Sequence, residues 1–181
     1  NHQVMNRGTL ANIRLKNMAA KGTTGGFARH LPSGEVAPLY DVATLYADEG
    51  TPLVIVGGKE YGTGSSRDWA AKGTALLGIK AVIVESFERI HRSNLIGMGV
   101  LPLQFLGGVT RETLGLTGDE AISLTGLSSG ITPGMTVKGN FAFADGRSET
   151  VNLLARIDTD GEADYFKNGG ILQYVLRQLA A

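Results

Sequence analysis

The chain has 181 residues with 17 basic and 17 acidic side chains, and 43% of its residues are hydrophobic. That length suits one domain, the hydrophobic share excludes a disordered chain, and the zero net charge argues against a general nucleic-acid coat or a membrane-surface binder. The lack of cysteine excludes disulfides and thiolate-held clusters within this chain, and no apolar run approaches the roughly 18 residues that span a bilayer.

The first 30 residues are basic and contain no Asp or Glu. Either this segment binds an anion, or its acidic partners come later in the chain. Asn1 stands in place of an initiator Met, which predicts that the chain is a piece of a longer polypeptide. No shift in composition marks a boundary, so we expect a single domain over 1–181. The basic side chains are Arg7, Arg14, Lys16, Lys21 and Arg29.

Hydrophobic periodicity predicts alternating helices and strands in the next part of the chain. Helices are expected over 36–48, 68–77 and 87–98, with Pro38 in the first turn of the first helix and Gly78 ending the second. Strands are expected over 53–56, 81–84 and 101–105, and the first two are continuous apolar runs typical of strands buried on both faces. This order predicts βαβ units and a parallel sheet.

Beyond Gly107 the pattern changes to short alternating runs. Antiparallel β structure is expected over 121–124, 135–143 and 149–157, with turns at Pro133-Gly134 and Asp145-Gly146. A last helix is expected over 171–179. The predicted fold class is therefore α/β, with an attached antiparallel β portion.

The glycine-rich loop, residues 57–68, falls between a predicted buried strand and a predicted helix. Ligands of open α/β sheets bind at such positions, where unpaired backbone N–H groups and the helix dipole attract anions. The loop is no standard nucleotide cradle, because no Lys follows Gly62 or Gly64 and Arg67 occupies the place of the third glycine of a dinucleotide fingerprint.

A purely structural interpretation of this loop is also open. Ser65 or Ser66 suits a helix N-cap, and Ser65-x-x-Asp68 resembles a capping box with Asp in place of Glu. Arg67 favours the functional interpretation, because a cation in the first helical turn opposes the dipole. Its presence indicates a compensating anion, and its planar fork can grip a carboxylate.

The segment 58–73, which contains Gly-Ser-Ser-Arg, resembles the aconitase family. The resemblance is closest to the carboxy-terminal swivelling domain of the aconitase A and iron regulatory protein branch, and it covers nearly the whole chain. It implies a swivelling β/β/α domain with a mostly parallel central sheet flanked by helices. Further segments that are similar to this family are 5–15, 77–83, 85–95 and 97–103.

The resemblance also implies a function. Aconitases interconvert citrate and isocitrate through cis-aconitate at a [4Fe–4S] cluster held by cysteines of other domains, so none would be bound by this chain. Carried over by motif, Ser65 is the base that removes the carbon-bound proton, Ser66 and Arg67 contact substrate carboxylate, and Arg14 is a further substrate-binding arginine. The implied partners are the cluster-bearing domains, with mRNA as a second ligand class for this branch. The implied location is the bacterial cytoplasm, without membrane contact.

Elementary chemistry agrees with these roles. Removing a proton from carbon beside a carboxylate builds negative charge, which preorganised donors and cations must stabilise. A serine hydroxyl becomes a base only where its alkoxide is stabilised, as beside a helix N-terminus and a guanidinium.

Two other enzymes of the same chemistry remain open, a 2-methylcitrate dehydratase and the small subunit of 3-isopropylmalate isomerase. The serine loop of the latter usually continues Arg-Glu-His, whereas this chain has Arg67-Asp68-Trp69. RNA binding is the alternative from a different class.

The three histidines share no metal-ligand spacing, so no metal site is expected in this chain. His91 is expected on the surface of its helix or behind the site. Glu88 and Arg92 are expected to pair at i,i+4 on an exposed helix face, and Trp69 to pack beneath the glycine-rich loop.

Overall fold

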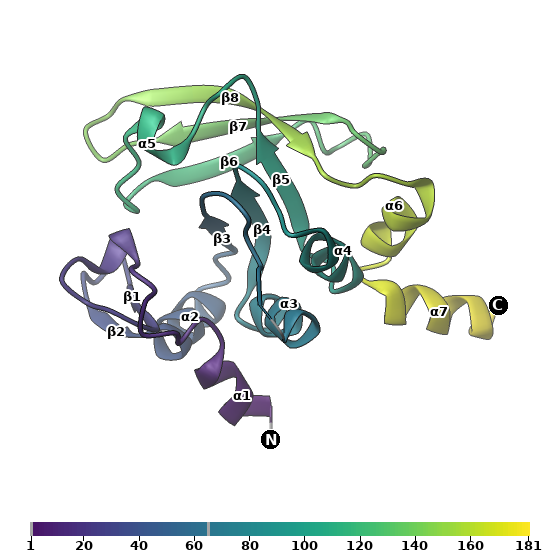
Figure 1. Ribbon diagram of the computed structural model, residues 1–181, viewed down its shortest axis with the longest axis horizontal. Coiled ribbons are helices and arrows are strands. Elements are labelled where there is room, and N and C mark those ends of the chain that lie inside the picture. The colour runs from purple at the N-terminus through teal and green to yellow at the C-terminus, as the bar shows by residue number, and fades with distance from the viewer. Residues whose placement is uncertain (1, 65) are drawn as a thin grey trace.

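The computed structural model describes residues 2–64 and 66–181, and its elements are arranged around one large sheet (Figure 1). In chain order the described elements are α1 (His2–Gly8), the 3₁₀ helix η1 (Met18–Ala20), β1 (Phe27–Arg29), β2 (Val36–Pro38), α2 (Leu39–Asp48), β3 (Leu53–Val56), α3 (Arg67–Leu76), β4 (Ile79–Val84), α4 (Arg89–Gly97), β5 (Leu101–Phe105), α5 (Arg111–Leu114), β6 (Ala121–Thr125), β7 (Thr136–Ala142), β8 (Ser148–Ala155), α6 (Asp160–Lys167) and α7 (Ile171–Ala180).

The six strands of the large sheet have the order β3-β4-β5-β8-β7-β6. β3, β4 and β5 run parallel, and β5 then pairs antiparallel with β8, where Leu103 lies opposite Ala155. β8, β7 and β6 continue as an antiparallel meander. The α/β class is confirmed, and the predicted parallel and antiparallel portions form one continuous sheet.

Strand β4 lies at the centre of the hydrophobic core, because its two faces join different clusters. Ala81 and Ile83 pack with side chains of β7 and β8, whereas Val82 and Val84 pack with α2, α3 and the end of α4. β3 was expected to be buried on both faces. Both faces do pack against the core, Val54 and Val56 on one cluster and Leu53 and Ile55 on the other, but all four residues are only half-buried. The reason is its place at the edge of the sheet, which leaves one side without a neighbouring strand.

Two predicted helices begin later than the periodicity indicated. The first begins at Leu39, because residues 36–38 pair with β1 and the Leu39 N–H extends that hairpin by donating to the Gly26 carbonyl (2.7 Å). Pro38 is consequently the N-cap residue and lies outside the first turn. The helix expected over 87–98 begins at Arg89, because the Glu88 carboxylate accepts from the His91 N–H (2.8 Å) and caps it.

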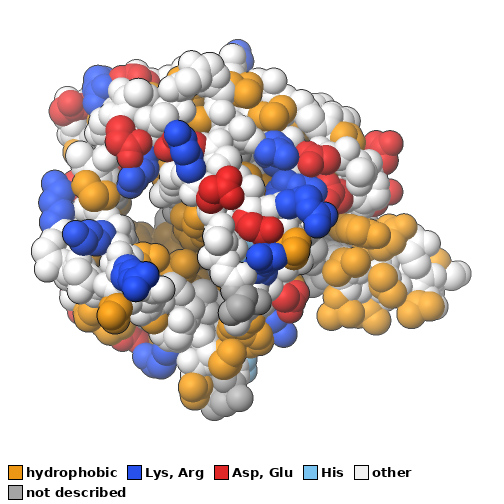
Figure 2. Space-filling model, in the orientation of Figure 1, with side chains coloured by type: hydrophobic (Ala, Val, Ile, Leu, Met, Phe, Trp, Pro, Cys, Tyr) orange, Lys and Arg blue, Asp and Glu red, His pale blue; other side chains and the backbone are white. Residues whose placement is uncertain are grey.

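The helices α3 and α4 lie side by side below the parallel strands, and α6 and α7 follow at the end of the chain (Figure 1). α7 contacts α6, where the rings of Tyr165 and Tyr174 meet edge to face with centroids 5.2 Å apart. None of its residues is buried, and several of its large apolar side chains are exposed. Figure 2 shows these apolar side chains gathered on the projecting helix at the right of the molecule.

Candidate functional site

The glycine-rich loop, residues 57–68, connects β3 to α3 at the carboxyl end of the parallel strands, as the sequence predicted. It runs beside the segment that follows β4, and backbone hydrogen bonds join the two. The Tyr61 N–H donates to the Ser86 carbonyl (3.0 Å), and the Glu88 N–H donates to the Tyr61 carbonyl (2.9 Å). The loop is therefore fastened to the start of α4.

Of the two serines in the loop, Ser65 lies outside the described residues, so its role as the base and its part in a capping box stay predictions. Ser66 is the N-cap residue of α3, and its backbone carbonyl accepts from the Ala70 N–H (2.9 Å). The Ser66 side chain is exposed and makes no capping hydrogen bond within the described part of the chain. The structure thus confirms an N-cap at Ser66, with the hydroxyl not used for capping.

Arg67 is the first residue of α3, and its guanidinium is anchored at one end. Its Nε donates to the Gly64 carbonyl (2.7 Å) and lies 3.4 Å from Oε2 of Glu88. Glu88 offsets the positive charge at the start of the helix from within the chain, so charge balance there does not by itself require the bound anion that the sequence indicated. Among the described residues both polar contacts of the guanidinium use Nε, so the two Nη groups stay available to an acceptor.

His91 is buried beneath the same loop, with 2% of its surface exposed. Its ring fills the space over Gly62, where a Cβ would come within 2.2 Å of the imidazole and where φ is +94°. Nδ1 lies 3.2 Å from the Arg67 carbonyl, and because a carbonyl oxygen only accepts, Nδ1 carries the proton. Of the two positions expected for His91, the helix surface is wrong and the place behind the loop is confirmed.

The predicted i,i+4 pair of Glu88 and Arg92 does not form. Glu88 turns to Arg67, whereas Arg92 is buried and its guanidinium binds Glu162 through two hydrogen bonds of 2.9 Å. The predicted exposed helix face is therefore also wrong, because tertiary partners outcompete the weak local pair. Trp69 is half-buried, with Lys72 over its ring.

The environment sets the charges around the loop. The His91 backbone N–H, assisted by Arg67, holds the pKa of Glu88 below its usual value. Burial lowers the pKa of His91, although the Arg67 carbonyl and Glu88 oppose this shift. Burial raises the pKa of Tyr61 to about 12. At neutral pH the loop residue Tyr61 is therefore neutral and Arg67 is cationic. Beside them, at the start of α4, Glu88 is ionised and His91 is neutral.

Arg14 is exposed and lies in the segment between α1 and η1. Its backbone N–H donates to Oδ1 of Asn12 (2.9 Å), which shapes the local turn. No direct hydrogen bond or ion pair joins Arg14 to Ser66 or Arg67 among the described residues, and its role in substrate binding stays a prediction.

The donor set of this chain does not fit an iron–sulfur cluster. Such clusters are held by cysteine thiolates, and the sequence has no cysteine. Within the described residues no group of His, Asp and Glu could hold a metal ion. Nor does any described helix combine the length and apolar character needed to cross a membrane.

Comparison with known proteins places these features in context. The sequence model of the aconitase C-terminal domain family matches residues 1–108. Aconitate hydratase A of Legionella pneumophila is 59% identical over 181 residues, covering 100% of this chain and 20% of that protein. Aconitate hydratase A of Escherichia coli is 58% identical over 179 residues, covering 99% of this chain and 20% of that protein. The chain spans about a fifth of the length of these relatives.

Among solved structures, a 3-isopropylmalate dehydratase from Methanocaldococcus jannaschii matches with a TM-score of 0.48 and 19% identity, covering 80% of each chain.

Proposed function

The chain belongs to the aconitase C-terminal domain family, and from that premise we propose that it is the part of an aconitate hydratase that binds substrate carboxylate and removes the carbon-bound proton. The reaction is the reversible isomerisation of citrate and isocitrate through cis-aconitate. Relatives with 58–59% identity that bear the name aconitate hydratase A support the assignment. We further propose that the chain alone is inactive, because it has no cysteine to hold a cluster.

The geometry of Arg67 is the observation that carries this proposal. Its guanidinium stands at the N-terminus of α3, where backbone dipoles already favour an anion. Because Nε binds the Gly64 carbonyl and Glu88, the Nη groups are left to form the parallel hydrogen bonds that arginine makes with a carboxylate. A citrate carboxylate fits this arrangement.

Ser65 and Ser66 have separate roles in the proposal. Ser65 removes the proton from carbon, and its alkoxide is stabilised by the helix N-terminus and by the neighbouring guanidinium. Ser66 donates its exposed hydroxyl, which does not cap α3 within the described structure, to a substrate carboxylate. Arg14 supplies a further cation for the remaining carboxylates of citrate when the parent enzyme closes around its substrate.

The proposed partners of this chain are cluster-bearing domains of the same parent protein, and they would hold the [4Fe–4S] cluster. The exposed apolar side chains of α7 support such an interface, since Leu172, Leu176 and Leu179 are 64%, 56% and 80% exposed. They form the apolar projection that Figure 2 shows. A bacterial cytoplasmic location stays a prediction.

The test is steady-state kinetics of the cluster-loaded parent enzyme with citrate. Replacing the base in Ser65→Ala lowers kcat by about 10²–10⁴-fold, and Arg67→Lys lowers kcat/KM by about 10²–10³-fold because the carboxylate loses its planar donor pair. Arg147→Lys, a surface change on the antiparallel side of the sheet, is the matched control and leaves both constants unchanged. Near-normal kcat in Ser65→Ala would overturn the assignment of the base.

The same assay separates the alternatives. Turnover of 2-methylcitrate or 3-isopropylmalate in preference to citrate would assign the loop to one of those substrates instead. RNA binding is not proposed, since the equal numbers of basic and acidic side chains give the chain no net positive charge to attract a polyanion.

A further inference from the structure

We propose that Glu88 and His91, both at the start of α4, are positioning residues that orient Arg67 for the substrate carboxylate. This inference rests on the function proposed above and adds two residues to it. Neither residue is expected to touch the substrate. Each acts on a different part of Arg67, the side chain in one case and the main chain in the other.

Glu88 acts on the side chain of Arg67. Its Oε2 lies 3.4 Å from Nε, and the Gly64 carbonyl lies 2.7 Å from the same nitrogen. The single Nε–H donates to the Gly64 carbonyl, and the Glu88 carboxylate lies beside the same nitrogen as an ion-pair partner, so rotation of the planar guanidinium is restricted. The opposite edge, which carries the Nη groups, then points in one direction before substrate arrives. Preorganisation of this kind lowers the entropic cost of binding.

His91 acts on the main chain of the loop at two points. Its Nδ1–H lies 3.2 Å from the Arg67 carbonyl, and its ring occupies the space that a side chain at Gly62 would need. The imidazole therefore supports the loop at two residues, Arg67 and Gly62. A change at His91 lets this backbone move and Arg67 with it.

A third contact joins the two positioning residues. The His91 backbone N–H donates to Oε2 of Glu88 at 2.8 Å, and the same oxygen faces Arg67. The carboxylate is thus oriented by the first turn of α4, a rigid element packed along α3. Support from a packed helix holds a binding group more accurately than support from a loop alone.

The experiment measures citrate affinity in the parent enzyme, by calorimetry on the cluster-free protein and as KM on the loaded protein. Glu88→Gln removes the charge facing Nε but keeps a capping oxygen, and it weakens citrate binding about tenfold, the scale of one hydrogen bond to a charged group. His91→Leu weakens binding by about the same factor. His91→Asn, which restores an N–H donor near the place of Nδ1, recovers most of the affinity.

Combining each change with Arg67→Lys distinguishes an effect that acts through Arg67 from a general loss of structure. In an Arg67→Lys background the changes at Glu88 and His91 have less than about a twofold further effect on citrate affinity, because the group they orient is gone. If both changes weaken binding equally in the two backgrounds, or leave it unchanged in the parent while Arg67→Lys weakens it, the positioning role is wrong. If Arg67→Lys itself leaves citrate affinity and turnover unchanged, the proposed function of Arg67 fails first. Should His91→Leu not fold, Glu88→Gln decides the question alone.

Discussion

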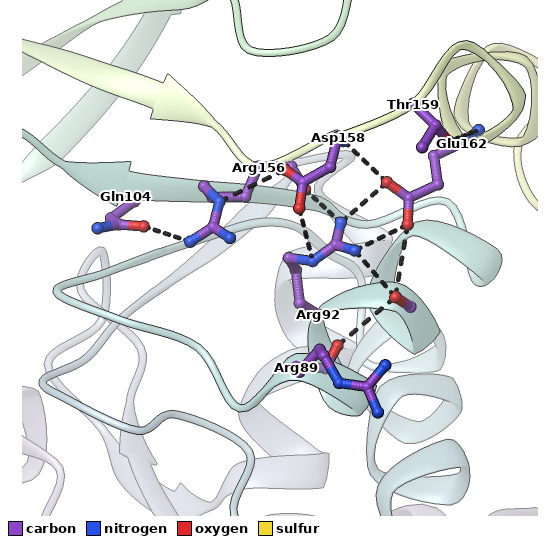
Figure 3. Close-up of polar contacts among 8 residues, drawn as sticks. Arg89, Arg92, Gln104, Arg156, Asp158, Thr159 and Glu162 are labelled. Carbon is purple, nitrogen blue, oxygen red and sulfur yellow. Dashed lines mark hydrogen bonds and ion pairs between the residues drawn. The ribbon is translucent and has the colours of Figure 1, made fainter.

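Two neighbouring residues of α4, His91 and Arg92, are buried polar side chains that serve different regions of the molecule. His91 and the Glu88 before it support the glycine-rich loop, through a few contacts that leave one end of Arg67 open. Arg92 instead reaches the connection between β8 and α6 and is surrounded by acceptors (Figure 3). The difference is that the described contacts of the Arg67 guanidinium all use Nε, whereas those of the Arg92 guanidinium use Nε and both Nη groups.

The joint around Arg92 connects the parallel strands to the end of the chain. Arg92 donates to both carboxylate oxygens of Glu162 and, at 2.7 Å, to the Arg156 carbonyl. Arg156 in turn donates to Gln104 on β5, and Asp158 lies 3.5 Å from both guanidinium groups (Figure 3). Burial alone would raise the pKa of Glu162, but the hydrogen bonds from Arg92 and from the Asp158 N–H outweigh it and lower the pKa.

The largest effect is expected from breaking this joint. Arg92→Leu leaves Glu162 as a shielded carboxylate without its cation, which costs about 3–5 kcal/mol of unfolding free energy. Urea denaturation of the chain measures this loss. The paired change Arg92→Met with Glu162→Leu recovers a large part of it, because neither charge is then left alone. Equal destabilisation by the single and paired changes would mean that packing, and not charge pairing, holds the joint.

On the loop side, the sharpest test of the contact with His91 is Gly62→Ala. The new methyl group would come within 2.4 Å of three His91 atoms at a φ of +94°, so backbone strain and overpacking together cost about 2–4 kcal/mol. Gly58→Ala is the matched control in the same loop, since its methyl group would meet only Oε1 of Glu85 at 3.7 Å. Thermal unfolding compares the two variants. Equal melting temperatures would show that the imidazole can move aside.

The sequence predicts what depends on local patterns and misses what depends on distant partners. Strands at 53–56 and 101–105 were predicted with their observed bounds, because each is a compact apolar run. The partners of Arg92 lie about 70 positions away in the chain, and no local spacing indicates them.

Some missed features did leave a local signal. α6 was not predicted, although Thr159-x-x-Glu162 has the form of a helix start and the Thr159 hydroxyl does accept from the Glu162 N–H (3.2 Å). For the site, the Gly-Ser-Ser-Arg motif pointed to the loop, and a place behind the site was one of the two positions expected for His91, but no local pattern indicated which atoms it would contact. Only the fold brings His91 against Gly62.

The smallest expected effect is a pH dependence of the unfolding free energy. We expect it from the His91 side of α4 and not from the Arg92 side. Because burial lowers the pKa of His91 in the folded state, the unfolded chain, with the ordinary value of 6.5, binds more protons in the interval between the two values. The stability linked to His91 is therefore complete above pH 6.5 and is lost as the pH falls towards the folded-state pKa. The charged and titratable groups facing the ring are Glu88, Arg67 and Tyr61, and the pKa of Tyr61 lies near 12, far from this interval.

Unfolding free energies measured between pH 8 and pH 5 test this dependence. Wild type loses stability below pH 6.5 relative to His91→Asn, which cannot take up the proton. Glu88 does not produce the same slope, because its pKa is held below the usual 4.5. Arg92→Leu keeps the slope, since its joint contains no histidine among the described contacts. If the unfolding free energy of His91→Asn still fell with pH as in the wild type, another group would be titrating. His91 would then contribute no more to the acid sensitivity of the chain than the contacts of Arg92 do.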